Sequence, residues 1–537
     1  MEIQRLEKMS KQVRFKPDYV WKNLHRLLCS EELWILAYEK QKSNAGTTTP
    51  AMALNDTVQG ISLEKIGNII LLFKKSAWKP QIDRKVQIPK PKTKELKTRK
   101  IQDGMDKLAQ GVVLLILQAL YEPIFRKYNY GFRPGMGTHE ALQYIERNFQ
   151  GIDTVLESDI KTCYPVMHHP ILMQILKRRI HDKKFLDVIQ KMLKAGLWGI
   201  KTDKLLTLDG TLSGSIVSPM LTNIYLHEMD LFIESWYKKN LIPLIKKRKK
   251  DLISSTSINV KSRVQSLQKL HNFNVKEEKA LKLKTLDMLT IIPENITPRL
   301  IYVRYADNFV LGTSLDTHNV VKLKDDLTKF LKNKLALTLN KKSKIVNITK
   351  ESCFFLGYNI KIDTSKKLLL IKPNNKSPYL KKITWHFVKL EIPIQNVINK
   401  LYQKGLCTGT GKPLSMGRLT PYDDQDIIRY GSNLLKSLFN FYAPSISTAH
   451  KHRIRYIVKF SLLHTFAHKY KSTVKKMHLK FGPDITLEYE STDKKDIITS
   501  KYVKLDKVNP AIIWKMGHQF KNIYSGYLGK SKNKLSR

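Results

Sequence analysis

Apolar residues recur with two kinds of spacing along this chain, and the spacing separates predicted strands from predicted helices. Thr154–Tyr164 (TVLESDIKTCY) has the pattern of a central strand that ends in an acidic residue. Leu300–Thr313 (LIYVRYADNFVLGT) predicts two strands joined by a tight turn at Asp307 and Asn308. Spacing near 3.6 residues predicts helices over residues 16–42, Leu108–Phe125, Pro421–Tyr442 and Ile454–His478. These patterns predict an α/β (α+β) part followed by a helical part.

Prolines and polar stretches mark the predicted boundaries between these parts. Lys85–Pro91 predicts a strand that stops at prolines, and Lys92–Lys100 predicts a basic loop after it. Residues 236–298 are polar and lysine-rich, which is typical of a surface insertion. The predicted organisation is an N-terminal helical extension over residues 1–75, an α/β part over 76–375, a helical part over 376–482 and a basic C-terminal extension over 483–537.

The chain carries far more basic than acidic residues. Lys and Arg number 95 against 46 Asp and Glu, which gives a formal net charge of +49 over 537 residues. The positive charges on such a surface repel one another, and a polyanion bound in the working state would offset this repulsion. Hydrophobic residues make up 42% and aromatic residues 9%, so we expect a folded protein rather than a disordered basic tail. Nucleic acid is therefore the expected partner.

Other classes of protein are disfavoured by the sequence. No apolar run reaches the roughly 18 residues that span a bilayer, and basic residues are spread along the chain, so no membrane partner is expected. Cys29, Cys163, Cys353 and Cys407 form no C-x-x-C pair, which disfavours disulfides and zinc. The N-terminal residues include acids and no apolar segment, which disfavours a secretory signal. Abundant Lys, Asn and Ile favour a mitochondrial protein first, a plastid protein second and a bacterial cytoplasmic protein third.

Asp159 and Asp307 are the candidate catalytic acids. Each lies at the end of a predicted strand, and neighbouring strands in one sheet would bring the two carboxylates together. Carboxylates can hold two divalent ions about 3.5–4 Å apart for phosphoryl transfer. Acids are also common in turns and after strands, so the pair alone leaves a purely structural role open.

The segments around these acids resemble sequence blocks of group II intron reverse transcriptases. Tyr305-Ala306-Asp307-Asn308 is similar to the YADD hairpin of that family, and Asp159-Ile160-Lys161 to its DIK block. Further similar blocks follow the family's order along the chain: Trp34–Tyr38, Trp78–Pro80, Ile88–Pro91, Tyr130–Gly135, Gly210–Pro219, Asn223–Leu226, Leu356–Tyr358, Tyr430–Tyr442 and Tyr456–Thr473. The similarity covers most of residues 20–482.

This resemblance implies a fold and a function. The expected fold is a reverse-transcriptase right hand, with fingers and an antiparallel palm sheet, followed by an α-helical thumb, the maturase domain X. The expected function is that of a group II intron maturase, which binds its intron RNA and promotes splicing while the RNA carries the chemistry. The alternative is an active RNA-directed DNA polymerase that uses Mg²⁺, deoxynucleotides and DNA.

The resemblance also assigns roles to individual residues. Asp159 and Asp307 would bind metal, with the Ile160 carbonyl as a third oxygen and Asn308 beside them in the catalytic turn. Tyr164 would lie under the incoming sugar, although a core tyrosine is the alternative. Further nucleotide-binding candidates are Lys97, Arg99, Ser213 and Lys344. The three basic residues among them could equally be solvated surface residues.

Three departures from the family pattern fall where metal and nucleotide would bind. Asn308 replaces the second aspartate of the turn, Ser213 and Ser215 replace the Gln and last Gly of the GTPQGG block, and Lys97–Gln102 replaces the RPLGIP strand. A carboxylate-to-amide change at such a site can remove several kcal/mol of transition-state stabilisation. The departures therefore predict weakened polymerase chemistry on a retained scaffold.

Basic residues in two regions are candidate RNA contacts. One region is the lysine cluster inside the predicted insertion, and the other is the helical part, where aromatic residues are interleaved with cations. Solvated cations and aromatic residues packed in the core are the alternatives. The candidates are Lys246, Lys247, Arg248, Lys249, Lys250, Arg429, Lys436, Arg453, Arg455, Lys459, Lys469, Lys471, Lys475 and Lys476.

Overall fold

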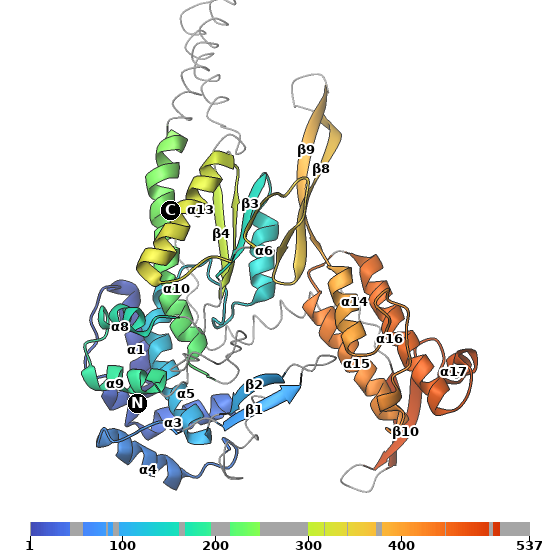
Figure 1. Cartoon of the computed structure of the whole chain (residues 1–537), viewed down its shortest axis with the longest axis horizontal. Helices are drawn as coiled ribbons and strands as arrows, with labels where there is room; N and C mark the ends of the chain where they lie inside the picture. The colour runs from blue at the N-terminus through green and yellow to red at the C-terminus, as the bar shows by residue number, and fades with distance from the viewer. Residues whose placement is uncertain are drawn as a thin grey trace, which may run out of the picture. The chain divides into compact units, whose positions relative to one another are not determined.

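The chain forms two compact units, whose helices and strands are shown in Figure 1. Unit 1 comprises Met1–Val86, Thr98–Phe132 and Asn148–Ile348, and unit 2 comprises Gln87–Lys97, Arg133–Arg147 and Thr349–Arg537. The computed structural model describes residues 2–42, 57–81, 84–89, 96–101, 103–160, 167–194, 215–246, 299–315, 317–340, 342–371, 379–445, 447–492 and 498–504.

A long apolar helix lies in the core of unit 1. α5 (Gly104–Tyr121) is buried on nearly all sides, and Asp103 caps its start by accepting hydrogen bonds from the backbone N–H groups of Met105 (2.8 Å) and Asp106 (3.3 Å). Among the described residues, Gly104–Ile124 is the one helical stretch long and apolar enough to cross a membrane by length and composition. Its most apolar window is 67% buried inside the protein, as in a core helix.

Other helices of unit 1 complete this core. α5 packs against α1, α2, α3 and α10. Trp34 of α3 is fully buried, because its ring packs near Phe73 while its indole N–H donates to the Leu28 carbonyl oxygen at 2.8 Å. The helices are α1 (Glu2–Phe15), α2 (His25–Leu28), α3 (Glu31–Gln41), α4 (Leu63–Lys74), a 3-10 turn (Glu122–Ile124), α8 (His169–Lys177), α9 (Lys183–Met192), α10 (Ser218–Trp236), a π-helical segment (Tyr237–Leu241) and α13 (Thr317–Leu335).

A four-stranded antiparallel sheet, which we call the palm sheet, lies beside α10 and α13 in Figure 1. Its strand order is β4-β5-β3-β6. β3 is interior, and pairs Asp159 with Asn308 on one side and Glu157 with Lys344 on the other. The strands are β3 (Thr154–Asp159), β4 (Leu300–Tyr305), β5 (Asn308–Thr313) and β6 (Lys344–Asn347).

Unit 2 combines a three-stranded sheet with a helical bundle. The sheet order is β7-β8-β9, and α16 is the central helix because it contacts α14, α15 and α17. The elements are β7 (Cys353–Phe355), β8 (Tyr358–Ile371), β9 (Tyr379–Glu391), α14 (Ile394–Gln403), a 3-10 turn (Gly417–Leu419), α15 (Asp424–Phe441), α16 (Thr448–Lys469), α17 (Val474–Phe481), β10 (Thr486–Thr492) and β11 (Ile498–Lys504). Three further elements are β1 (Arg84–Pro89), β2 (Leu96–Ile101) and α6 (Thr138–Asn148).

The predicted strands at the two acids and the predicted apolar helix are confirmed. β3 ends at Asp159, β4 and β5 flank a two-residue turn, and α5 covers most of Leu108–Phe125. The turn lies one residue earlier than predicted, at Ala306 and Asp307, because Asn308 already pairs as the first residue of β5. The antiparallel palm sheet and the helical region after it agree with the predicted right-hand fold. These elements share strong local patterns, which is why the sequence predicted them.

Four predicted elements need correction. Residues 96–101 form β2 instead of a basic loop, because their backbone pairs with β1. β9 pairs with β8, so the helices of the predicted helical part begin at Ile394 instead of near residue 376. Residues 16–24 lie outside any helix, because α1 ends just before Pro17.

The fourth correction concerns the predicted helix Ile454–His478, which is two helices. α16 ends at Lys469, and Lys471 has a left-handed φ of 45° that no helix accommodates. Thr473 then caps α17, because its side chain accepts a hydrogen bond from the Lys476 backbone N–H at 3.3 Å.

Candidate catalytic and nucleic-acid site

The palm sheet brings Asp159 and Asp307 together. Asp159 is the last residue of β3 and pairs with Asn308, the first residue of β5. Asp307 lies in the two-residue turn before β5, and its carbonyl oxygen accepts a hydrogen bond from the Ile160 backbone N–H at 3.1 Å. Two acids far apart in the sequence are therefore neighbours at one end of the sheet.

Burial and like charge act together on this pair. Burial raises the pKa of the Asp307 carboxyl above its ordinary value, and the nearby Asp159 carboxylate raises it further. A divalent cation between the two carboxylates would offset their mutual repulsion. The electrostatics therefore suit a cation, whose positive charge would favour the ionised form of Asp307.

Each carboxylate also has an amide partner. Asn308 Nδ2 donates a hydrogen bond to Asp307 Oδ1 at 3.1 Å, and Asn340 Nδ2 donates to Asp159 Oδ2 at 2.9 Å. The Asn340 backbone N–H also donates to the Asp159 carbonyl oxygen at 2.9 Å. Asn340 was not among the predicted site residues, because nothing near it in the chain points to Asp159.

The donor set fits a divalent cation, with fewer acids than the family pattern implies. Carboxylate oxygens are hard ligands that suit Mg²⁺, and Asp159 and Asp307 supply them. Among the described residues, no group of three His, Cys, Asp or Glu side chains could hold a metal ion. Asn308 stands where a third carboxylate would stand. The Ile160 carbonyl as a further ligand stays a prediction.

A buried ion pair lies behind the turn. Arg304 is fully buried, and its Nη2 lies 2.6 Å from Asp230 Oδ2 on α10, which is also fully buried. Arg304 Nε and the Tyr302 hydroxyl both donate to Asp230 Oδ1 at 2.9 Å. Such a pair is stable only when the remaining polar atoms are hydrogen-bonded, as they are here.

The same arginine holds the backbone of the turn. Arg304 Nη1 donates to the Ala306 carbonyl oxygen at 3.0 Å, and Ala306 has the left-handed φ of 56°. Arg304 Nη1 also lies 3.3 Å from Asn223 Oδ1. Asp230 was not among the predicted site residues. Its spacing carries a signal, because Asn223 and Asp230 are seven residues apart on one helix and therefore share a face.

Most of the predicted nucleotide-binding residues cannot be placed. Tyr164 and Ser213 lie outside the described residues, as do the side chains of Lys97 and Arg99, whose backbone belongs to β2. Lys344 is exposed at the start of β6, opposite Glu157 of β3. Their proposed contacts with nucleotide stay predictions.

The predicted RNA-binding residues differ in whether the structure describes them and in how exposed they are. Lys247, Arg248, Lys249 and Lys250 lie outside the described residues, and Lys246 is exposed. Six predicted contacts in the helical region are exposed: Arg429, Lys436, Arg453, Lys471, Lys475 and Lys476.

Three other candidates are half-buried and have partners within unit 2. Lys469 Nζ lies 2.7 Å from Asp424 Oδ1, and Arg455 Nη2 lies 3.0 Å from Asp484 Oδ1. Lys459 Nζ lies 3.2 Å from His478 Nε2, and burial lowers the pKa of Lys459. These contacts give the three cations structural roles within the bundle.

Two family models match this chain. The model described as reverse transcriptase (RNA-dependent DNA polymerase) matches residues 88–247. The model described as type II intron maturase matches residues 385–513. The first match contains β3 with Asp159, and the second contains the helical bundle of unit 2.

Curated relatives match over most of the chain. The group II intron-encoded protein LtrA of Lactococcus lactis subsp. cremoris is 31% identical over 481 residues, covering 88% of this chain and 78% of the relative. The uncharacterized 91 kDa protein in cob intron of Schizosaccharomyces pombe is 29% identical, covering 98% and 65%. The uncharacterized mitochondrial protein ymf11 of Marchantia polymorpha is 27% identical, covering 72% and 56%.

Proposed function

We propose, from the premise that this chain belongs to the group II intron-encoded protein family, that it binds its intron RNA and promotes splicing of that RNA. The chain is a group II intron maturase built on a reverse-transcriptase scaffold. In this function the RNA carries the splicing chemistry, and the protein stabilises the folded RNA.

The observation that carries this proposal is the set of residues at the turn between β4 and β5, namely Ala306, Asp307 and Asn308. We call this segment the palm turn. Asn308 occupies the position of the family's second turn aspartate and donates its amide N–H to Asp307. The amide brings no negative charge, so the site attracts a divalent cation less strongly than three carboxylates would. The scaffold around the turn, including the buried Arg304–Asp230 pair, is intact. A retained scaffold with a weakened reaction centre supports RNA binding as the main role.

Exposed cations supply the physical basis for stabilising RNA. Phosphates repel one another as an intron folds, and each Lys or Arg that neutralises a phosphate also releases condensed counterions. The exposed cations of the helical bundle, such as Lys475 and Lys476, are suited to this role. The protein would thereby replace part of the Mg²⁺ that the folded RNA needs.

Splicing at low Mg²⁺ tests the proposal. Intron excision is followed with the full chain and without it, and we expect excision to be faster with the protein. Lys475→Ala combined with Lys476→Ala on α17 should reduce the acceleration. The matched control, Lys329→Ala with Lys332→Ala on α13, removes the same charge and should retain it. Equal excision rates with and without the natural protein would refute the proposed function.

An active RNA-directed DNA polymerase is the second candidate, because Asp159 and Asp307 are still adjacent. These two acids would hold Mg²⁺, which when bound would stabilise charge during phosphoryl transfer. Primer extension on an RNA template separates the candidates. Extension by the natural chain that disappears in Asp159→Ala would establish polymerase activity, and extension only by Asn308→Asp would show that the amide suppresses it.

A mitochondrial location is the proposed setting. The Lys, Asn and Ile content favours an organelle, and a relative from Marchantia polymorpha is named a mitochondrial protein. A plastid location is the alternative. Detection of the protein in purified mitochondria, and not in plastids, would test this.

A further inference from the structure

An exposed phenylalanine lies beside the palm turn in an unusual backbone conformation. Phe132 is 53% exposed, and its φ of 54° is left-handed, a region that L-residues rarely adopt. An apolar ring exposed to water lacks the stabilisation that burial would give it, and a left-handed backbone is unfavourable for a residue with a Cβ. Neither feature stabilises the fold, which indicates that the exposed ring has a functional role.

The backbone before Phe132 is held tightly in place. Residues 128–130 lie along β4, since the Arg304 N–H donates to the Tyr128 carbonyl oxygen at 2.9 Å and the Tyr130 N–H donates to the Arg304 carbonyl oxygen at 2.8 Å. The Gly131 carbonyl oxygen accepts a hydrogen bond from Asn223 Nδ2 at 2.7 Å.

Gly131 also fits closely against the turn. A Cβ at Gly131 would lie 2.3 Å from the Ala306 backbone nitrogen, so only glycine permits this approach. The position of Phe132 is therefore set by its backbone, and its ring is left at the surface.

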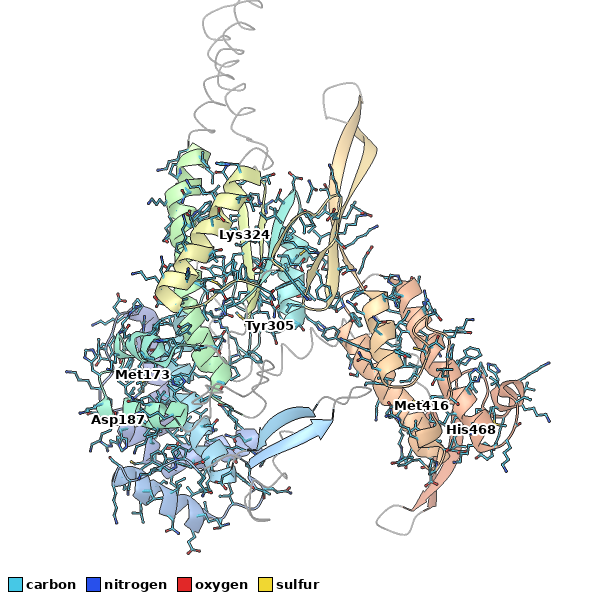
Figure 2. The ribbon with its side chains drawn as sticks, viewed as in Figure 1. Met173, Asp187, Tyr305, Lys324, Met416 and His468 are labelled. Atoms are coloured by element: carbon cyan, nitrogen blue, oxygen red, sulfur yellow. The ribbon has the colours of Figure 1, made fainter. Side chains whose placement is uncertain are left out.

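The ring of Phe132 has an aromatic neighbour that adjoins the acids. The ring centroids of Phe132 and Tyr305 are 5.8 Å apart at an interplanar angle of 46°. Tyr305 is the last residue of β4, directly before the turn that carries Asp307, and is labelled at that end of the strand in Figure 2. The two rings therefore lie at the same end of the palm sheet as Asp159 and Asp307.

We propose that Phe132 and Tyr305 form an aromatic platform on which an unpaired base of the bound RNA stacks. Aromatic side chains accept any base through its π face, and a formal net charge of +49 favours a polyanion as the occupant. The proposal rests on the proposed function and deepens it, because it places one RNA nucleotide beside the two acids.

Ultraviolet crosslinking of the full chain to its intron RNA tests the platform directly. Stacked bases crosslink to the aromatic side chain that they contact, and mass spectrometry locates the modified residue. We expect a crosslinked nucleotide on Phe132 or Tyr305. Absence of a crosslink at both residues in a complex that crosslinks elsewhere would overturn the platform.

Substitutions at Phe132 separate stacking from folding. Phe132→Gly removes the ring and suits the left-handed backbone, so the protein should stay folded while RNA affinity falls about tenfold. Phe132→Trp should retain the affinity, whereas Phe132→Leu, which is apolar without a π face, should lose it. Phe15→Ala is the matched control, because Phe15 is 85% exposed at the end of α1. The dissociation constant and thermal unfolding are measured for each variant.

Each result separates the platform from the proposed function. If the natural protein binds its intron RNA and Phe132→Gly or Phe132→Leu binds it equally well, the platform is refuted and the maturase function stands. If the natural protein does not bind that RNA above unrelated RNA, both are refuted. Loss of affinity in Phe132→Gly and Phe132→Leu, with retention in Phe132→Trp and Phe15→Ala, supports the platform.

Discussion

At the scale of single residues, the palm turn depends on side chains that never reach the surface. Ala306 adopts a left-handed φ of 56°, and the buried Arg304 guanidinium holds its carbonyl oxygen. Arg304 is in turn neutralised by Asp230 from α10. The position of Asp307 is therefore coupled, through two buried charges, to a helix distant in sequence.

Removing Asp230 should destabilise unit 1 strongly. Asp230→Ala leaves Arg304 as an unpaired buried charge, a change that costs about 3–5 kcal/mol of unfolding free energy. Asp426→Ala breaks the exposed pair with Arg429 and should change that free energy by about 1 kcal/mol or less. Urea unfolding measures both variants. A loss for Asp230→Ala no larger than that for Asp426→Ala would contradict the role of the buried pair.

His227 should make the stability of the protein depend on pH. Burial lowers the pKa of this imidazole from 6.5 to about 4, so the unfolded chain binds a proton that the folded chain excludes. Its contribution is fully present above pH 6.5 and is lost as pH falls towards 4. Unfolding free energies between these pH values should fall less steeply in His227→Gln than in the natural chain. An equal pH slope in His227→Gln and the natural chain would contradict this role of His227.

At the scale of elements, close helix packing organises unit 2. Gly431 lies where α15 meets α16, and a Cβ there would lie 2.4 Å from Leu462 Cδ1. Leu462 is fully buried, so its side chain has no room to move away. The glycine therefore sets how closely the two helices approach.

Two helical glycines should respond oppositely to alanine. Gly431→Ala overpacks the contact between α15 and α16 and should cost about 1–3 kcal/mol of unfolding free energy. Gly67→Ala on α4 meets nothing within 4 Å and should stabilise the chain by about 0.5–1 kcal/mol, because alanine favours the helix. Thermal unfolding distinguishes them. A stabilising effect of Gly431→Ala would mean that the helices tolerate a wider spacing.

At the scale of the whole molecule, the excess of positive charge is divided between internal and external roles. Some cations pair with acids of the same unit, as Lys469 does with Asp424 and Arg455 with Asp484. Others, including Lys475 and Lys476, are exposed on α17. A high net charge alone therefore overstates the number of cations available to phosphates.

RNA affinity should depend steeply on salt. Each neutralised phosphate contributes to the slope of log affinity against log salt, so Lys476→Ala should reduce that slope by about 1. Lys329→Ala on α13 removes the same charge and should leave the slope unchanged. Titrations of intron RNA at several salt concentrations provide the measurement. An identical slope for the natural chain and Lys476→Ala would remove Lys476 from the interface.

The sequence by itself determined the features that local patterns encode. Strand β3 ending in Asp159, the turn at Asp307 and the apolar helix α5 follow from periodicity and turn residues within short windows. The family was likewise recognisable from short blocks in a fixed order. Local patterns were wrong where pairing with the preceding strand decides the element, as for β2 paired with β1 and β9 paired with β8.

Only the tertiary structure decided which further side chains serve the site, because these residues carry no signal in the local sequence. Asn340 contacts Asp159 at the end of β3, Asp230 neutralises Arg304, and Phe132 keeps an exposed ring beside Tyr305. Burial, ion pairing and ring exposure are properties of contacts between residues far apart in the chain. No window of sequence contains them, because they exist only once the strands and helices have packed.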